Sequence, residues 1–420
     1  MAFGGGRRLV VLGFGAIGAG LFVYEAYGTG AYAPPVVVDV RAELVHGLRA
    51  DDGRFALNIA RPDRVDVATI GPIMPVDSTA QPERVVEAIA DADEFASALP
   101  SVAFYQGPGP ASPHRLLAEG LRRRLRPDPL IVYCAENHRS AARLLSSAVL
   151  DCVPDDERET VRARARFVDT VIGKMSGVIS DPAERERLGV SRITSALPDA
   201  FLVEAFDRIL VSRVGDGLHP GMPALREVGD LAPFEDAKLL GHNATHALAG
   251  FLGASFDLTL MSELTEVPGV MGFLRAAFID ESGATLRRRW AGADELFTQA
   301  GYAAFADDLL ERMVNPWLAD TVERAARDPR RKLGWDDRLI GLVRLGLSQG
   351  VPTPRYAVGV VAGLDLLRAA GASGSDEALL RSTWPAGADE AEVQAVLAVV
   401  AEGREWADRR ATGGFGAPVT

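Results

Sequence analysis

A glycine-rich turn near the N-terminus constrains the fold of this chain most. A short run of β-branched and leucine residues, 8–12, ends at Gly13, and the sequence Gly13-Phe14-Gly15-Ala16-Ile17-Gly18 follows at once. An apolar helical pattern covers 19–26, and a second strand-like run, 35–39, ends in an acid. Strand, glycine turn, helix, strand and acid in this order are typical of a dinucleotide-binding βαβ unit.

Each glycine of the turn has its own expected task. Gly13 permits the tight bend, Gly15 lets a pyrophosphate approach the backbone, and Gly18 lets helix and strand pack closely. Phe14, Ala16 and Ile17 complete the turn, and the N–H groups at the helix start face the phosphates. Asp39 is expected to accept hydrogen bonds from the adenosine ribose and to repel a 2′-phosphate, which favours NAD over NADP; Arg41 is the residue that can weaken this preference.

The same N-terminal stretch has a second interpretation. Arg7-Arg8, the apolar run 9–24 and Ala31-Tyr32-Ala33 together resemble a secretory or twin-arginine signal. A signal peptide has no need of a complete glycine motif in register, so we favour a mature strand and helix. The only cysteines are Cys134 and Cys152, too few for a disulfide framework, and a reducing cytoplasm is therefore expected.

Composition limits the partners of the chain. It has 420 residues, enough for two or three domains, with 48% apolar residues and a formal net charge of −12. An acidic chain of this kind does not suit nucleic acid or an anionic membrane surface as its main partner. No apolar stretch is long enough for a membrane helix. A small-molecule ligand is expected, and the oligomeric state stays open.

The order of the remaining segments predicts the fold class. Strand-like runs at 101–105, 130–134 and 165–169 alternate with helical patterns at 114–124 and 140–150, and 201–212 again reads as extended. This alternation predicts an α/β fold: a Rossmann-type, doubly wound and mostly parallel sheet in a domain of residues 1–228. Helical patterns dominate from residue 234 onward, which predicts a mainly α-helical C-terminal domain, 229–420.

Two loops at the carboxyl ends of these strands are further candidates for cofactor contacts. Gly107 follows the run at 101–105, and Glu136 and Asn137 follow the run at 130–134. In a doubly wound sheet such loops line the ligand crevice. Ordinary turn formation is an equally good explanation for both.

A second constellation lies in the helical half. Lys238, Asn243 and His246 stand at i, i+5 and i+8, which in an α-helix puts the asparagine about 140° and the histidine about 80° from the lysine. A possible base, an amide donor and an imidazole then share one face, as proton removal from an alcohol requires. His242 and His246 also have the spacing of a zinc pair, but Asn243 replaces the glutamate of such motifs and no third ligand is near, so no metal is expected.

With these residues, the chain resembles the long-chain polyol-specific dehydrogenases. Further segments that carry the resemblance are Phe167-Val168-Asp169, Glu281-Ser282-Gly283-Ala284, Asn315-Pro316-Trp317-Leu318, Arg331-Lys332-Leu333 and Asp337-Arg338-Leu339-Ile340. The resemblance implies a Rossmann-type domain followed by a helical domain, a nicotinamide cofactor and a reaction without metal. It also implies that Lys238 is the general base, Asn243 a donor to the reacting oxygen and His246 the group that orients it, with Glu235 linking the lysine to solvent. A solvated acid at the start of a helix is an equally good explanation for Glu235.

The resemblance also implies residues for the substrate. Asp169, Arg324, Arg331 and Lys332 match its substrate positions, and forked arginine donors beside a lysine suit a phosphate dianion. An ordinary basic helix end would give the same residues. The expected reaction is NAD-dependent interconversion of a hexitol phosphate and a ketose phosphate, with D-mannitol 1-phosphate and D-fructose 6-phosphate favoured.

Several alternatives stay open from the sequence. One is a relative acting on an unphosphorylated polyol, or on a sugar acid such as fructuronate or tagaturonate. Another is a catalytically silent NAD-binding protein, which the intact lysine, asparagine and histidine set disfavours. The third is an exported zinc hydrolase built on His242 and His246.

Overall fold

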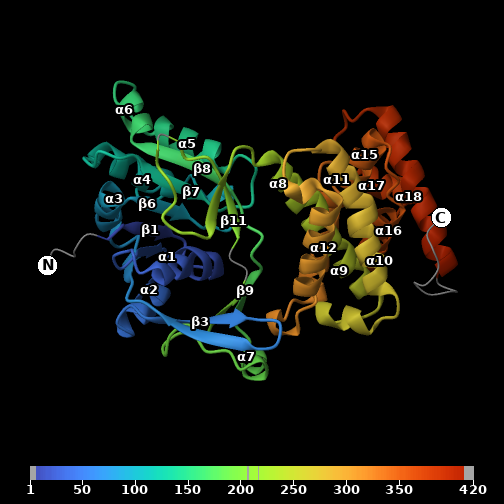
Figure 1. Ribbon diagram of the computed structural model, residues 1–420, viewed down its shortest axis with the longest axis horizontal. Coiled ribbons are helices and arrows are strands. Elements are labelled where there is room, and N and C mark those ends of the chain that lie inside the picture. Colours follow the sequence, from blue (N-terminus) through green and yellow to red (C-terminus); the bar gives the residue numbers. More distant parts are fainter. Residues whose placement is uncertain (1–5, 206–207, 216, 411–420) are drawn as a thin grey trace. The chain divides into compact units, whose positions relative to one another are not determined.

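The computed structural model describes residues 6–205, 208–215 and 217–410. By its internal contacts the chain divides into two compact units, Met1–Leu231 and Ala232–Thr420. The sequence placed the boundary three residues earlier, between residues 228 and 229. Strands occur in the first unit, and the second is built of helices (Figure 1). We describe the two units one after the other.

An eight-stranded sheet forms the centre of the first unit, in the order β12-β11-β8-β7-β6-β1-β2-β5. Its strands are β1 (Leu9–Leu12), β2 (Val36–Asp39), β5 (Met74–Asp77), β6 (Glu94–Ser97), β7 (Leu130–Cys134), β8 (Ala165–Val171), β11 (Ile209–Ser212) and β12 (Leu225–Val228). All neighbours are parallel except β11 and β8. From β5 to β8 the order is that of a Rossmann sheet, which confirms the expected fold class.

One expected strand is wrong. Residues 101–105 contain a short 3-10 helix, η2 (Val102–Phe104), and the strand beside β1 is β6 instead. The apolar run at 101–105 was misleading because Phe104 is 57% exposed. The true strand begins with the buried Glu94, whose charge hides the apolar pattern from sequence reasoning.

A second, four-stranded sheet was not anticipated. It has the order β4-β3-β10-β9 and consists of β3 (Phe55–Ala60), β4 (Val65–Ile70), β9 (Ser176–Ile179) and β10 (Ala200–Glu204). Strands β3 and β10 are parallel, and the two edge strands are antiparallel to them. Strands β3 and β4 form a local hairpin, but β9 and β10 come from a segment more than 100 residues later, so no local pattern pairs the two halves of the sheet.

Both faces of the large sheet are covered, as a parallel sheet requires. Leu9 and Val11 of β1 belong to one apolar core, and Val10 and Leu12 belong to the other. The unit's helices are η1 (Gly18–Val23), α1 (Tyr24–Thr29), α2 (Ala42–Ala50), α3 (Pro82–Asp91), α4 (Pro113–Arg123), α5 (Ala141–Asp151), α6 (Arg158–Ala163) and α7 (Pro182–Leu188). The core that contains Leu9 also includes residues of η1 and of the second sheet. The core that contains Val10 also includes residues of α3, α4 and α5.

The N-terminal arginines take part in this fold. Arg7 pairs with the buried Glu94 at 2.9 Å, and the backbone N–H of Arg8 donates to Asp93. The apolar run that follows forms β1 and the η1–α1 helix inside the core. The expected buried strand and helix are therefore confirmed.

The second unit is helical throughout its described part. After α8 (Ala232–Asp236) come η3 (Ala237–Asn243), α9 (Ala244–Ser255), η4 (Met261–Glu266), α10 (Val270–Ala276), η5 (Ala277–Gly283), α11 (Ala284–Arg289), η6 (Glu295–Phe297) and α12 (Gln299–Met313). The chain continues with η7 (Pro316–Leu318), α13 (Val322–Ala326), α14 (Pro329–Lys332), α15 (Arg338–Gln349), α16 (Pro354–Ala369), α17 (Asp376–Arg381) and α18 (Glu390–Arg410). None of the helices described has the length and apolarity to cross a membrane.

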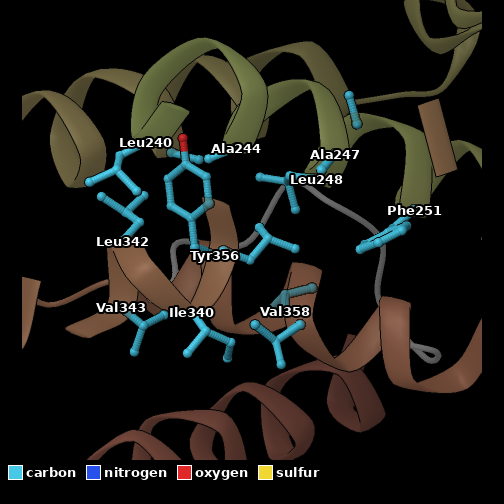
Figure 2. Packing of buried hydrophobic residues seen from close by; sticks show 14 of the residues in the cluster. Leu240, Ala244, Ala247, Leu248, Phe251, Ile340, Leu342, Val343, Tyr356 and Val358 are labelled. Carbon is cyan, nitrogen blue, oxygen red and sulfur yellow. The ribbon is translucent and has the colours of Figure 1, made fainter. Parts of the chain in front are cut away.

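The helix formed by η3 and α9 is the centre of this unit's core. Its buried residues Leu240, Ala244, Ala247, Leu248 and Phe251 pack on residues of α15 and α16 (Figure 2). These positions follow the three- and four-residue spacing of one helical face. Several of the positions between them lie on the opposite face of the same helix.

Candidate functional site

The glycine turn of the first unit has the geometry that a pyrophosphate requires. Gly13 has a φ of +92°, where a side chain is strained, and a Cβ on Gly18 would lie 2.2 Å from the Gly13 carbonyl oxygen. At Gly15, by contrast, no atom lies within 4 Å of an added Cβ. The turn is therefore closed at its two ends and open in the middle, in front of a helix start whose N–H groups favour an anion.

The other turn residues have different surroundings. The ring of Phe14 is fully buried and packs edge-on against Phe55 at 5.0 Å, so only its backbone lies at the turn. Ala16 is buried and Ile17 half-buried. Their side chains serve the core, and any cofactor contact at these positions involves the backbone.

Asp39 and Arg41 form a bidentate pair at the end of β2. Arg41 Nε and Nη2 donate to the two carboxylate oxygens at 3.0 Å each, and the Phe14 N–H donates to Asp39 at 2.9 Å. Burial opposes ionisation, but the hydrogen bonds from Arg41 outweigh it and hold the pKa of Asp39 below its ordinary value. The acid next to the turn is therefore ionised, and its charge is matched by Arg41.

Glu136 lies inside the fold rather than at its surface. It is 2% exposed, and its carboxylate accepts hydrogen bonds from Ser97 Oγ at 2.6 Å, from the Leu99 N–H at 2.9 Å and from the Tyr105 hydroxyl. Burial raises its pKa. The expected direct contact of Glu136 with the cofactor does not fit this position, because its oxygens are used to fix the segment after β6.

The neighbouring candidates differ from Glu136. Asn137 is exposed directly after β7, at the carboxyl edge of the sheet, where a ligand can reach it. Gly107 follows η2 instead of a strand, so the reasoning that placed it at a strand end is wrong. Its expected contact with the cofactor stays a prediction.

Asp169 has a structural partner. Its Oδ1 accepts a hydrogen bond from the Ala142 N–H at 2.8 Å, which caps the start of α5. Burial raises the pKa of this carboxyl, against the opposing effect of the Ala142 bond. A cavity of about 480 Å³ lies beside it, lined among others by Arg143, Arg162 and Arg166. Asp169 therefore has a capping role in the first unit, and its expected contact with substrate stays a prediction.

In the second unit, Lys238 and Asn243 lie in a π-helical turn, η3. The expectation of an α-helix is wrong here. In a π-helix the hydrogen bonds join residues five apart, which brings positions i and i+5 nearly above one another. The two side chains are therefore closer to alignment than the α-helical angle predicts. Lys238, His242, Asn243 and His246 are half-buried on the face opposite the apolar one.

Lys238 has surroundings that favour the neutral amine. Burial first, and the charge of Arg338 second, lower its pKa to about 8, against the opposing charge of Glu235. Arg338 begins α15, and its side chain is 12% exposed beside Asp337. Glu235 is half-buried in α8, one turn before the lysine. The structure thus couples Glu235 to Lys238 electrostatically and adds Arg338, which sequence reasoning had not assigned.

His246 is held by a carboxylate that the sequence analysis missed. Its Nε2 lies 2.7 Å from Oδ2 of Asp320, and Arg324 Nε lies 2.7 Å from the other oxygen, Oδ1. The Asp320 side chain is 3% exposed. Burial opposes ionisation, but the bonds from His246 and Arg324 hold the pKa of Asp320 well below its usual range. Its place two residues after the Asn315–Leu318 segment was the only signal available in the sequence.

The two remaining basic candidates, Lys332 and Arg331, differ in their surroundings. Lys332 is 4% exposed, its Nζ donates to the Ala325 carbonyl, and burial with the charge of Arg338 lowers its pKa to about 8. Arg331 is half exposed and paired with Asp328 at 3.0 Å. Lys332 and Lys238 thus share Arg338 as a charged neighbour. Arg331 instead has an exposed ion pair, as expected of an ordinary basic helix end.

The histidine pair shows no metal-site geometry. The rings of His242 and His246 are 6.4 Å apart between centroids, and His246 Nε2 is directed to Asp320. Across the described ranges, no group of three or more His, Cys, Asp or Glu side chains could hold a metal ion. Burial first, and then electrostatic interactions with His246 and Arg312, lower the pKa of His242 well below its ordinary value.

Fold and site together define a dinucleotide-dependent oxidoreductase with a Rossmann-type unit and a helical unit. Family models agree in both halves: the mannitol dehydrogenase Rossmann domain matches residues 7–212 and the mannitol dehydrogenase C-terminal domain matches residues 230–406. The chain belongs to the mannitol dehydrogenase family. It is a polyol dehydrogenase that uses a nicotinamide cofactor.

Individual relatives and solved structures are consistent with this family. Mannitol-1-phosphate 5-dehydrogenase of Bacillus licheniformis is 28% identical over 78% of this chain and 80% of its own, and that of Aspergillus terreus is 25% identical over 80% of both. A substrate-free D-sorbitol dehydrogenase superimposes with a TM-score of 0.77 over 96% of this chain and 94% of its own. A Pseudomonas fluorescens mannitol 2-dehydrogenase complex with NAD and D-mannitol gives 0.69 over 98% and 93%. Both structures are 16% identical to this chain and show the fold alone.

Proposed function

We propose that this protein interconverts a hexitol phosphate and a ketose phosphate with NAD, with D-mannitol 1-phosphate and D-fructose 6-phosphate as the favoured pair. The observation that carries the proposal is Lys238, a half-buried amine with a pKa near 8 on the same helical face as Asn243 and His246. The named relatives at 25–28% identity act on mannitol 1-phosphate, which supports the phosphorylated substrate.

The lysine content of the chain supports a special role for Lys238. Lys174, Lys238 and Lys332 are the only lysines in a chain with 45 lysines and arginines, and Lys174 and Lys332 are buried. Arginine therefore supplies the basic charge of the surface. Because arginine does not lose its proton in proteins, a lysine is needed wherever an amine must accept one.

In the proposed reaction, each residue acts on the substrate oxygen or its proton. Neutral Lys238 accepts the hydroxyl proton, and the Asn243 amide donates to the oxygen as negative charge develops. The Asn243 side chain is half-buried on the same helical face as Lys238, which suits this contact. One such donor is worth roughly 3 kcal/mol at a developing oxyanion. Asp320 holds Nε2 of His246, which leaves Nδ1 as the nitrogen that can meet the oxygen. A bound nicotinamide supplies the hydride acceptor.

The glycine turn fits the cofactor that the proposal needs. Gly15 is open, the helix start behind it favours phosphate, and Asp39 is ionised at the end of β2. The pairing of Asp39 with Arg41 reduces the repulsion that Asp39 alone exerts on a 2′-phosphate. We therefore propose NAD as the preferred cofactor, with NADP accepted less well.

Positive charge in the second unit favours an anionic substrate. Burial first, and the charge of Arg338 second, lower the pKa of both Lys238 and Lys332, so both amines lie within electrostatic range of the Arg338 guanidinium. A phosphate offers more acceptors to such a group than a neutral polyol does. The carboxylate of fructuronate or tagaturonate is the second candidate that this charge allows.

The test is NADH oxidation by the purified protein with fructose 6-phosphate, fructose and fructuronate. We expect kcat/KM for fructose 6-phosphate to exceed that for fructose by about 100-fold or more, equivalent to roughly 2.7 kcal/mol. If fructuronate has the highest kcat/KM, the assignment shifts to a sugar-acid reductase. Equal kcat/KM for fructose and fructose 6-phosphate would exclude a phosphorylated substrate as the preferred one. The Lys238→Ala variant should lose turnover and still bind NADH; retained turnover removes the lysine from the mechanism.

A further inference from the structure

Two π-helical turns of the second unit are joined by one side chain. The first is η3, which carries Lys238 and Asn243, and the second is η5. The hydroxyl of Ser282, in η5, donates to the backbone carbonyl oxygen of Leu240, in η3, at 2.9 Å. Ser282 is fully buried, so this bond is shielded from water. A buried carbonyl inside the turn that carries the lysine thus has a side-chain donor.

Tyr302 completes this junction. Its hydroxyl lies 2.9 Å from Ser282 Oγ, and the ring is 1% exposed. A Cβ on Gly241 of η3 would lie 2.6 Å from the Tyr302 hydroxyl oxygen, and a Cβ on Gly283 of η5 would lie 2.7 Å from its ring. Both π-helical turns therefore have a glycine where Tyr302 approaches, and no larger residue fits without moving the ring.

A second connection links η5 to the residues that follow Asn243. Glu281, next to Ser282, accepts hydrogen bonds from the backbone N–H groups of Arg355 at 2.9 Å and Tyr356 at 3.1 Å, at the start of α16. The Tyr356 hydroxyl then lies 2.6 Å from Thr245 Oγ1. The helix is thus tied to η5 on either side of Asn243. Before it, Ser282 binds the Leu240 carbonyl, and after it, the Thr245 hydroxyl is linked to η5 by way of α16.

From these contacts we infer that Ser282 is a positioning residue, which keeps segment 237–243 in the π-helical form and so holds Lys238 and Asn243 in register. The inference rests on the proposed function of those two residues. If η3 relaxed to an α-helix, the asparagine would turn to about 140° from the lysine, away from the alignment that the π-helix provides. A small displacement of a reacting group is enough to cost about 100-fold in rate.

The experiment compares Ser282→Ala with Ser255→Ala. Ser255 lies at the end of the same helix and also donates to a carbonyl, that of Leu252 at 2.7 Å, so the control loses a similar bond outside η3. For Ser282→Ala we expect kcat to fall about 10- to 100-fold, while KM for NADH changes less than about twofold. Amide hydrogen exchange across 237–246 should become faster. The control should match the wild type in all three readouts.

Other outcomes overturn the inference. One is that Ser282→Ala keeps the wild-type kcat and the wild-type rate of amide exchange. The other is that Ser282→Ala and Ser255→Ala lose kcat equally. If the wild type turns over no polyol or ketose, the proposed function fails, and the exchange of 237–246 still tests the role of Ser282. Should Ser282→Ala not fold, Tyr302→Phe is the alternative, because it removes only the tyrosine hydroxyl that contacts Ser282 Oγ. For this variant we expect a smaller fall in kcat with the same cofactor KM. An unchanged kcat in that variant would overturn the inference.

Discussion

The imidazole of His246 and the carboxylate of Asp320 lie 2.7 Å apart, Nε2 to Oδ2, inside the helical unit. The other oxygen of the same carboxylate accepts from Arg324 Nε at 2.7 Å. One buried acid therefore orients both the proposed catalytic imidazole and the proposed substrate arginine. A carboxylate in this position fixes which imidazole nitrogen carries the proton, as the partner of a catalytic histidine does in other enzymes.

Asp320→Asn should lower kcat because an amide can present the wrong hydrogen-bonding partner to His246. We expect a loss of about 100-fold or more, with the cofactor KM little changed. Steady-state kinetics with fructose 6-phosphate and NADH measure it. The control is Asp307→Asn, which removes an exposed carboxylate paired with Arg275 at 2.6 Å and should leave kcat as in the wild type. A kcat for Asp320→Asn within about twofold of wild type would exclude the assigned role.

The pH dependence of polyol oxidation should report Lys238. Its pKa is lowered to about 8, and only the neutral amine accepts a proton. The rate should therefore fall about tenfold per pH unit below that pKa and level off above it. Rates at constant cofactor saturation across this range measure the profile.

Lys238→Arg supplies the matched variant for this prediction. It retains the positive charge but holds a group that stays protonated, so it should be inactive at every pH. Lys174→Arg is the control, since Lys174 is a buried lysine of the first unit that the proposed mechanism does not use. A flat profile in the wild type, or turnover by Lys238→Arg, would contradict the general-base role.

The glycine turn gives a prediction that separates binding from stability. Gly15→Ala places a methyl group in open space, so its thermal unfolding should match the wild type while NADH binds more weakly. Gly18→Ala places a methyl group 2.2 Å from the Gly13 carbonyl oxygen, and overpacking of this kind costs about 1–3 kcal/mol of stability. Calorimetric titration and thermal unfolding measure the two effects. Full NADH affinity in Gly15→Ala would show that the pyrophosphate lies elsewhere.

The pairing of Asp39 with Arg41 predicts how cofactor preference can change. Asp39→Ser should release the guanidinium, which now donates to both carboxylate oxygens, and let it meet a 2′-phosphate. We expect the ratio of kcat/KM for NADPH to that for NADH to rise about tenfold or more, since a charge-assisted hydrogen bond is worth about 1.5–3 kcal/mol. The double variant Asp39→Ser/Arg41→Ala should lose the gain. A gain that persists without Arg41 would assign the selectivity to Asp39 alone.

Local pattern was sufficient for much of the first unit and for the type of chemistry. The βαβ order around Gly13–Gly18, the ionised acid at Asp39 and the helical second half all follow from runs of neighbouring residues, because strands, glycine turns and helices are set by contacts along the chain. The spacing of Lys238, Asn243 and His246 likewise indicated one helical face. It did not indicate the π-helical turn, which depends on partners from a distant helix.

Only the tertiary structure decided which candidates lie inward and what holds them. Glu136 was chosen for its place after a strand, and folding turns it into the core, where Ser97 and Tyr105 use its oxygens. Asp320 and Ser282 are 74 residues from His246 and 42 residues from Leu240, respectively, so no sequence window contains either pair. The sequence by itself determined the fold class, because this depends on local periodicity, and it indicated the candidate reacting groups. The orientation of those groups was decided by long-range hydrogen bonds between buried polar atoms, which form only once the helices have packed.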